Sequence, residues 1–193
     1  MFRNNWKKEI LTIPNLLSLF RLVLIPVYAQ LYLRAVTPVQ HYTAGAIMAV
    51  SCLTDAIDGR IARQFNMITT LGKILDPLAD KMTQLALTLC LSIRYPVLKA
   101  VLALFVVKEV FQLVLAAIHL LYGKILPGAL MTGKICTTVL FVSLIALVVL
   151  PQIPAALVKA IAVTDGFFLT VSFVSYLLAY FGKHSLVQDL NPD

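Results

Sequence analysis

Four aspartates stand close together in a chain that has few charges. Asp55, Asp58, Asp76 and Asp80 are four of the nine acidic residues, and they fall within 26 of the 193 positions. On helices, spacings of three and four residues place the members of each pair on one face. Carboxylates gathered in this way repel one another and require positive charge. Hard oxygen ligands suit Mg²⁺, Mn²⁺ or Ca²⁺, and two such ions about 3.5–4 Å apart are a common arrangement for phosphoryl chemistry.

Residues beside the aspartates favour a ligand that carries phosphate. Gly59, Ala62 and Gly72 are small, so a backbone or a bulky ligand can approach closely there. Arg60 and Arg63 follow Asp58 and could hold phosphate or lipid-headgroup oxygens. No His or Cys stands at ligand spacing within the cluster, which disfavours zinc.

Each of these residues also has a structural interpretation. Asp76 precedes Pro77 and could be only a helix N-cap, with proline at the first helical position. The two arginines could only anchor the chain's topology or pair with the neighbouring aspartates. Four acids at this spacing are not explained together by such roles, so the pattern favours a divalent-metal site.

The elements that carry the aspartates belong to a membrane protein. Hydrophobic residues make up 60% of the chain, charged residues 13%, and mean hydropathy is +0.90. A soluble domain of this size could not bury so much apolar surface, and disorder requires low hydrophobicity. The three cysteines lie in apolar stretches, which indicates packing residues and not a disulfide framework.

Six segments are long and apolar enough, or nearly so, to cross the hydrocarbon core as helices. They cover approximately residues 16–34, 40–63, 70–93, 97–121, 133–150 and 157–181. Short connections containing proline or glycine separate most of them. We therefore predict an all-α bundle of six transmembrane helices that forms a single membrane domain over residues 1–193.

The N-terminal segment and the basic residues predict an orientation. Residues 1–13 mix apolar and basic side chains at helical spacing, which is typical of an interfacial helix, although a disordered tail is the alternative. Eight basic residues fall on the side of both termini and four on the other side, so we expect both termini and the aspartates in the cytoplasm. The net charge of +7 then indicates contact with anionic lipid. No basic patch interleaved with aromatics indicates nucleic-acid binding.

The segment that begins at Asp55 and ends at Asp80 reads DAIDGRIARQFNMITTLGKILDPLAD. It fills every fixed position of D-x2-D-G-x2-A-R-x8-G-x3-D-x3-D and resembles the signature of the CDP-alcohol phosphatidyltransferases. The stretches IPNLLSLFR (13–21) and DPLADK (76–81) are most similar to the phosphatidylglycerophosphate synthases and the synthase-type cardiolipin enzymes of that family.

The resemblance implies an enzyme that transfers a phosphatidyl group from CDP-diacylglycerol to an alcohol and releases CMP. It implies that Asp55, Asp58 and Asp76 bind two divalent cations, Mg²⁺ or Mn²⁺. Asp80 is expected to complete the metal site and to act as general base on the acceptor hydroxyl.

The resemblance also implies a CDP-diacylglycerol pocket, a homodimer and a location in the cytoplasmic membrane of a bacterium. The residues expected to shape the pocket are Gly59, Ala62, Arg63 and Gly72, and Asn15 could face it from the first span.

The acceptor is expected to be glycerol 3-phosphate, whose phosphate requires cations. The candidates are Lys81, Lys108, Lys134 and Arg21. Lys108 could instead form only an internal pair with Glu109, where many phosphatidylglycerophosphate synthases carry Arg-Glu. Phosphatidylglycerol is the alternative acceptor and would give cardiolipin.

Two other classes of membrane protein compete with the enzyme. A divalent-cation transporter would use carboxylates along a path, but the acids cluster near one face, and Asp165 is the main intramembrane acid elsewhere. Asp165 could line a cavity or meet a partner helix. A structural membrane module would leave the spacing of the four aspartates unexplained.

Overall fold

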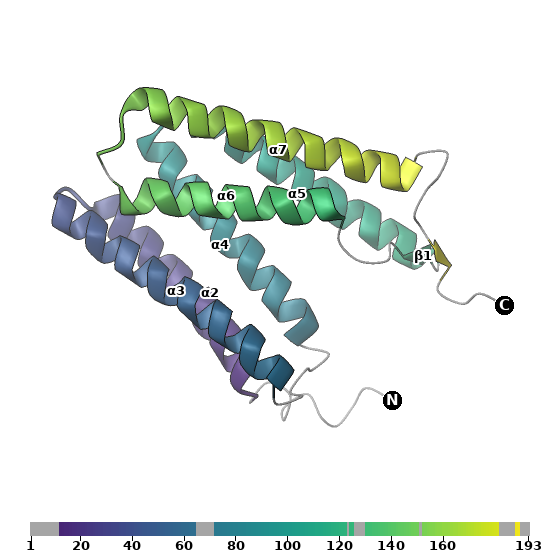
Figure 1. Ribbon diagram of the computed structural model, residues 1–193. Helices are drawn as coiled ribbons and strands as arrows, with labels where there is room; N and C mark the ends of the chain where they lie inside the picture. The colour runs from purple at the N-terminus through teal and green to yellow at the C-terminus, as the bar shows by residue number, and fades with distance from the viewer. Residues whose placement is uncertain are drawn as a thin grey trace. The chain divides into compact units, whose positions relative to one another are not determined.

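The computed structural model describes residues 12–64, 72–122, 124–125, 130–150, 152–181 and 188–189 (Figure 1). The helices in these ranges are α2 (Ile13–Arg34), α3 (Pro38–Gln64), α4 (Gly72–Arg94), α5 (Leu98–Leu121), α6 (Met131–Val149) and α7 (Ala155–Phe181). Each predicted span corresponds to one of these helices, and the ends agree to within one turn. The predicted interfacial helix falls mostly on residues 1–11, which lie outside the described residues.

A short antiparallel strand pair was not predicted. Strand β1 (Lys124–Ile125) follows α5, and strand β2 (Gln188–Asp189) follows α7. Lys124 lies opposite Asp189 and Ile125 opposite Gln188. Two residues per strand give no alternating pattern for sequence reasoning to detect.

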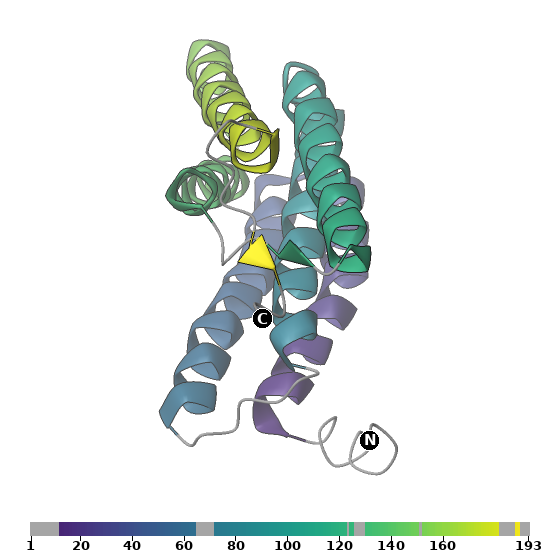
Figure 2. The ribbon, with the colours of Figure 1, turned by 90° about the vertical axis from the view of Figure 1, so that its right-hand side faces the viewer.

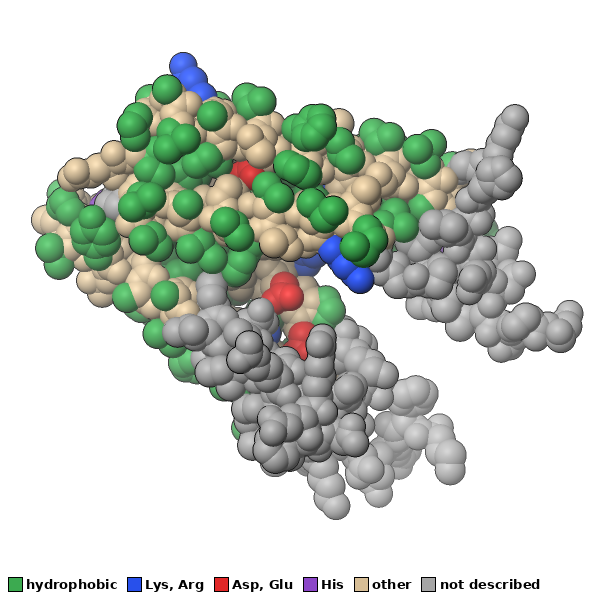
Figure 3. Space-filling view, in the orientation of Figure 1, with side chains coloured by type: hydrophobic (Ala, Val, Ile, Leu, Met, Phe, Trp, Pro, Cys, Tyr) green, Lys and Arg blue, Asp and Glu red, His purple; other side chains and the backbone are tan. Residues whose placement is uncertain are grey.

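Four of the described helices are long and apolar enough to cross a membrane. The segments are Asn15–Arg34 in α2, Leu98–His119 in α5, Met131–Val149 in α6 and Ala155–Phe181 in α7. Large apolar side chains are exposed along these helices (Figure 3), which is the surface that lipid requires. The chain is therefore an integral membrane protein. Helices α3 and α4 carry the charged residues of the aspartate motif.

The chain divides into two compact units, which are described one at a time. The first consists of residues 1–90 and 148–151, and contains α2, α3 and most of α4. The second consists of residues 91–147 and 152–193, and contains α5, α6, α7 and the strand pair.

In the first unit, a capped turn sets α3 beside α2. The side-chain Oε1 of Gln40 accepts the backbone N–H groups of Val36 and Thr37 at 2.7 and 3.0 Å. Thr37 Oγ1 accepts the N–H of Gln40 in return, at 3.4 Å. This reciprocal capping, with Pro38 as the first helical residue, fixes where α3 begins. The two helices consequently run antiparallel and side by side (Figures 1 and 2).

In the second unit, ring contacts join α5 to α7. The rings of Phe111 and Phe173 are 5.0 Å apart, and those of His119 and Tyr180 are 4.7 Å apart. The strand pair lies beyond the same ends of both helices. Aromatic contacts and main-chain pairing therefore tie these ends together.

Asp165 connects α7 to α6 within the second unit. Its side chain is buried, and Ser143 Oγ lies 2.7 and 2.8 Å from its two carboxyl oxygens. Of the two interpretations drawn from the sequence, the contact with a partner helix is the one observed. A polar contact between apolar helices of this kind holds them in one register.

We expect Ser143→Ala to lower the free energy of unfolding by about 1–3 kcal/mol, because it removes a donor to a buried acid. The double variant Ser143→Ala/Asp165→Leu should recover part of this loss, since both polar partners are then gone. The measurement is an SDS unfolding titration of the purified protein. Thr170→Val is the control, because Thr170 is exposed on α7 and bonds only its own helix, at Gly166 O. Equal stability of Ser143→Ala and Thr170→Val would contradict the prediction.

Candidate active site

Helix α2 carries a buried stripe of polar residues. Asn15, Ser18 and Arg21 stand three residues apart, so they share one face of the helix. Their exposed fractions are 1%, 0% and 2%. Buried polar side chains require partners, and α4 supplies two of them.

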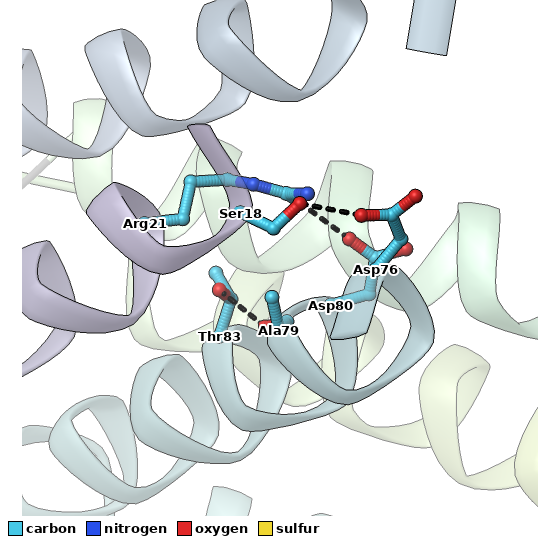
Figure 4. A network of polar contacts seen from close by, with 6 residues as sticks. All are labelled: Ser18, Arg21, Asp76, Ala79, Asp80 and Thr83. Carbon is cyan, nitrogen blue, oxygen red and sulfur yellow. Dashed lines mark hydrogen bonds and ion pairs between the residues drawn. The ribbon is translucent and has the colours of Figure 1, made fainter. Parts of the chain in front are cut away.

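The polar stripe on α2 contacts the aspartates of α4 (Figure 4). The hydroxyl of Ser18 donates a hydrogen bond to Oδ1 of Asp76. One turn further along both helices, Arg21 Nη1 lies 2.7 Å from Asp80 Oδ1. The helices run in the same direction through this region, and each contact fixes the register that the other requires.

The side chains of the ion pair differ in exposure. Arg21 is 3% exposed, whereas Asp80 is 48% exposed. The guanidinium is therefore fixed inside the unit, and the carboxylate that it contacts reaches the surface. Asp80 is placed where a ligand from outside could approach it.

Helix α4 begins before the aspartates and not at them. Its first residue is Gly72, and Pro77 lies inside the helix. The interpretation of Asp76 as an N-cap is therefore wrong. Gly72, Asp76 and Asp80 are four residues apart, so they share one face of α4. Gly72 is buried, and its lack of a side chain lets a neighbouring group approach the backbone closely.

The predicted residues of α3 lie on a continuous helix, but their side chains are outside the described residues. These residues are Asp55, Asp58, Gly59, Arg60, Ala62 and Arg63. Ser51, one turn before Asp55, lines a small cavity together with Tyr28 of α2 and Thr83 of α4. The three helices thus converge one turn away from the aspartates. This supports a single cluster of four carboxylates, which stays a prediction.

The donors present fit a divalent cation as far as they are described. Asp76 and Asp80 are hard oxygen donors, and the contacts from α2 engage Oδ1 of each. A carboxylate has acceptor capacity at both oxygens, so each can take a further partner. The described side chains contain no group of three or more His, Cys, Asp or Glu that could hold a metal. Asp55 and Asp58 stay predicted ligands, because their side chains lie outside the described residues.

The lysine candidates for the acceptor fall in both units. Lys81 is partly exposed on α4 in the first unit. In the second unit, Lys134 is exposed at the start of α6, and Lys108 is buried on α5. Lys108 Nζ lies 2.8 Å from Glu109 Oε1 and 5.9 Å from the ring centre of Tyr176. Lys108 therefore pairs with Glu109, and its binding of the acceptor stays a prediction.

Sequence reasoning missed Ser18, which donates to one of the predicted metal ligands. Its signal was present, because it lies midway between Asn15 and Arg21 in a helix that is otherwise mostly apolar. A serine in a membrane helix often bonds its own backbone, and the sequence alone does not show the partner on α4.

Comparison with known proteins covers most of the chain. The family model described as CDP-alcohol phosphatidyltransferase matches residues 11–177. The chain belongs to this family. The matched range includes the polar stripe on α2 and the whole aspartate motif.

Relatives in the family carry different names. A cardiolipin synthase (CMP-forming) of Streptomyces coelicolor is 33% identical over 131 residues, which cover 67% of this chain and 61% of the relative. A CDP-diacylglycerol–glycerol-3-phosphate 3-phosphatidyltransferase of Bacillus subtilis is 28% identical over 158 residues, which cover 76% of this chain and 81% of the relative.

A third relative is much longer than this chain. It is a cardiolipin synthase (CMP-forming)/mitochondrial hydrolase fusion protein of Schizosaccharomyces pombe. It is 36% identical over 122 residues, which cover 63% of this chain and 20% of the relative. The match thus spans less than two thirds of the Streptomyces and Schizosaccharomyces relatives.

Proposed function

We propose that this chain transfers a phosphatidyl group from CDP-diacylglycerol to glycerol 3-phosphate, releasing CMP and forming phosphatidylglycerophosphate. One observation carries the proposal. Asp76 and Asp80 are presented on one face of α4 and held by buried donors from α2, inside the range that the family model matches.

In the proposed reaction, the acceptor hydroxyl oxygen attacks the phosphatidyl phosphorus. The bond from that phosphorus to the bridging oxygen breaks, and CMP leaves with that oxygen. Asp80 takes the hydroxyl proton, and its half-exposed side chain suits contact with a ligand that arrives from water.

The proposed metal ligands are Asp55, Asp58 and Asp76, and Asp80 completes the set. Two bound Mg²⁺ or Mn²⁺ ions would neutralise the charge that develops on the pyrophosphate oxygens. Ser18 and Arg21 orient two of these carboxylates before any ligand arrives, so less ordering remains for the reaction itself.

The proposed CDP-diacylglycerol pocket lies around the same aspartates. Gly59, Ala62 and Arg63 lie near the end of α3, and Gly72 is the first residue of α4. Asn15 is buried on the α2 face that carries Ser18. Small residues admit the bulky headgroup, and the planar guanidinium of Arg63 suits its phosphate oxygens.

The choice of glycerol 3-phosphate is supported by the Bacillus relative, because that match covers more of both chains than the other two matches described. The positive net charge favours a phosphorylated acceptor. Candidate ligands for its phosphate are Lys81, Lys108, Lys134 and Arg21. The Streptomyces relative supports the second candidate, phosphatidylglycerol, which would give cardiolipin.

We further propose six spans, with both termini and the aspartates on the cytoplasmic side of a bacterial membrane. Helices α3 and α4 have 27 and 23 residues, which at 1.5 Å per residue correspond to about 40 and 35 Å and suffice to span the hydrocarbon core. Residues 1–193 then form one membrane domain, with residues 1–13 as its interfacial segment. The domain is proposed to work as a homodimer.

The main test measures CMP release from CDP-diacylglycerol by purified protein in lipid, with Mg²⁺ or Mn²⁺. Asp76→Asn and Asp80→Asn should each lower the rate by about 100-fold or more, because a metal ligand or a proton acceptor is lost. Asp165→Asn is the matched control, since it changes an acid that bonds only Ser143 among the described contacts. Full activity in Asp80→Asn would overturn the proposed base.

The acceptor is identified by offering glycerol 3-phosphate, phosphatidylglycerol, serine and inositol in parallel assays. We expect glycerol 3-phosphate to give the largest metal-dependent release of CMP, with a product that carries a second phosphate. Mass spectrometry of the extracted lipid checks the product. Formation of cardiolipin from phosphatidylglycerol, with no response to glycerol 3-phosphate, would replace the acceptor and leave the reaction class intact.

A further inference from the structure

Two neighbouring carboxylates on α4 are held by donors of different charge. Asp76 accepts from the neutral hydroxyl of Ser18, and Asp80 is paired with the guanidinium of Arg21 at 2.7 Å (Figure 4). Both donors come from the same face of α2. The two carboxylates are therefore oriented alike but differ electrostatically.

A neutral donor and a cationic donor have different consequences for cation binding. The hydroxyl of Ser18 orients Asp76 and leaves its negative charge available to a bound cation. The guanidinium of Arg21 offsets the negative charge of Asp80. Oxygen sites with more negative charge bind divalent cations more tightly. Asp76 is thus the stronger metal ligand of the two, and Asp80, which completes the proposed set, is the weaker one.

The burial of Arg21 makes this arrangement persistent. Its side chain is 3% exposed, and a buried cation that loses its counter-charge is strongly unfavourable. The buried guanidinium therefore requires a counter-charge, and Asp80, whose own side chain is 48% exposed, supplies one. A pair with one buried and one exposed member holds the carboxylate at a fixed point of the surface.

We propose that Arg21 is a positioning residue that prevents Asp80 from binding metal at full strength and thereby reserves it for the acceptor hydroxyl. This inference rests on the proposed function. It gives Arg21 a role that differs from direct binding of the acceptor's phosphate, because Arg21 acts through Asp80. Asp76 and Asp80 then differ in role, because different residues of α2 hold them.

The test is Arg21→Gln, with two measurements on the full chain in lipid nanodiscs. Mn²⁺ binding without substrate, followed by electron paramagnetic resonance of the free ion, should tighten by about threefold or more, because a nearby positive charge is gone. The kcat for CMP release should fall by about tenfold or more, because Asp80 is no longer held in position. Tighter metal binding together with slower turnover is the expected signature.

Neighbouring variants separate charge from geometry. Arg21→Lys keeps the charge but loses the planar fork, so Mn²⁺ affinity should stay near that of the wild type while kcat falls. In Arg21→Gln/Asp80→Asn the gain in Mn²⁺ affinity should disappear, since the gain comes from Asp80.

Ser18→Ala should change Mn²⁺ affinity in the opposite direction. It should weaken binding by about threefold, because Asp76 loses its orienting donor. Arg34→Gln, an exposed arginine on the same helix, should change neither quantity.

Arg21→Gln variants that lose Mn²⁺ affinity and kcat together, as a damaged site would, overturn the inference. So does an unchanged kcat. A wild-type protein that binds Mn²⁺ but releases no CMP with any acceptor contradicts the proposed function instead, and the opposite effects of Arg21→Gln and Ser18→Ala on Mn²⁺ binding still decide the inference. Arg21→Lys keeps the test valid if Arg21→Gln fails to fold.

Discussion

The arrangement of the first unit depends on one requirement. Its helices belong to a membrane protein, and the negative charge of the carboxylates that they carry must be compensated. An uncompensated aspartate in a membrane helix costs roughly 2.5–3.5 kcal/mol at the helix centre. Helix α2 provides part of the compensation through Ser18 and Arg21. That requirement explains why α2 buries three polar residues on one face while its other faces expose apolar side chains such as Phe20 and Val23.

The same requirement fixes how the helices are arranged. Donors three residues apart on α2 meet acceptors four residues apart on α4, so only one register of the two helices satisfies both contacts. The capped turn at Thr37 and Gln40 holds α3 beside α2. Helices α3 and α4, which carry the aspartates, thereby both contact α2.

Much of this arrangement could be predicted from the sequence, because apolar runs and proline breaks define helices locally. The shared faces of the aspartate pairs also follow from helical spacing. The partners of Asp76 and Asp80 could not be predicted, since they stand 58 and 59 residues away in the sequence and depend on the register between helices. The start of α4 was ambiguous as well, because Pro77 suits the first helical position after an Asp76 cap, whereas the helix begins at Gly72 and continues through the proline. The strand pair β1–β2 was too short to leave a pattern.

Two acids of this chain show how surroundings separate a structural carboxyl group from a chemical one. Asp165 is 1% exposed and is bonded by the neutral hydroxyl of Ser143 on the preceding helix, so it joins α7 to α6. Asp80 is paired with a buried cation and is half exposed. A carboxyl group enclosed with a hydroxyl can only stabilise packing, whereas a carboxylate held at the surface can exchange partners. Both acids are aspartates on helices of one membrane protein, and they differ in partner and in exposure.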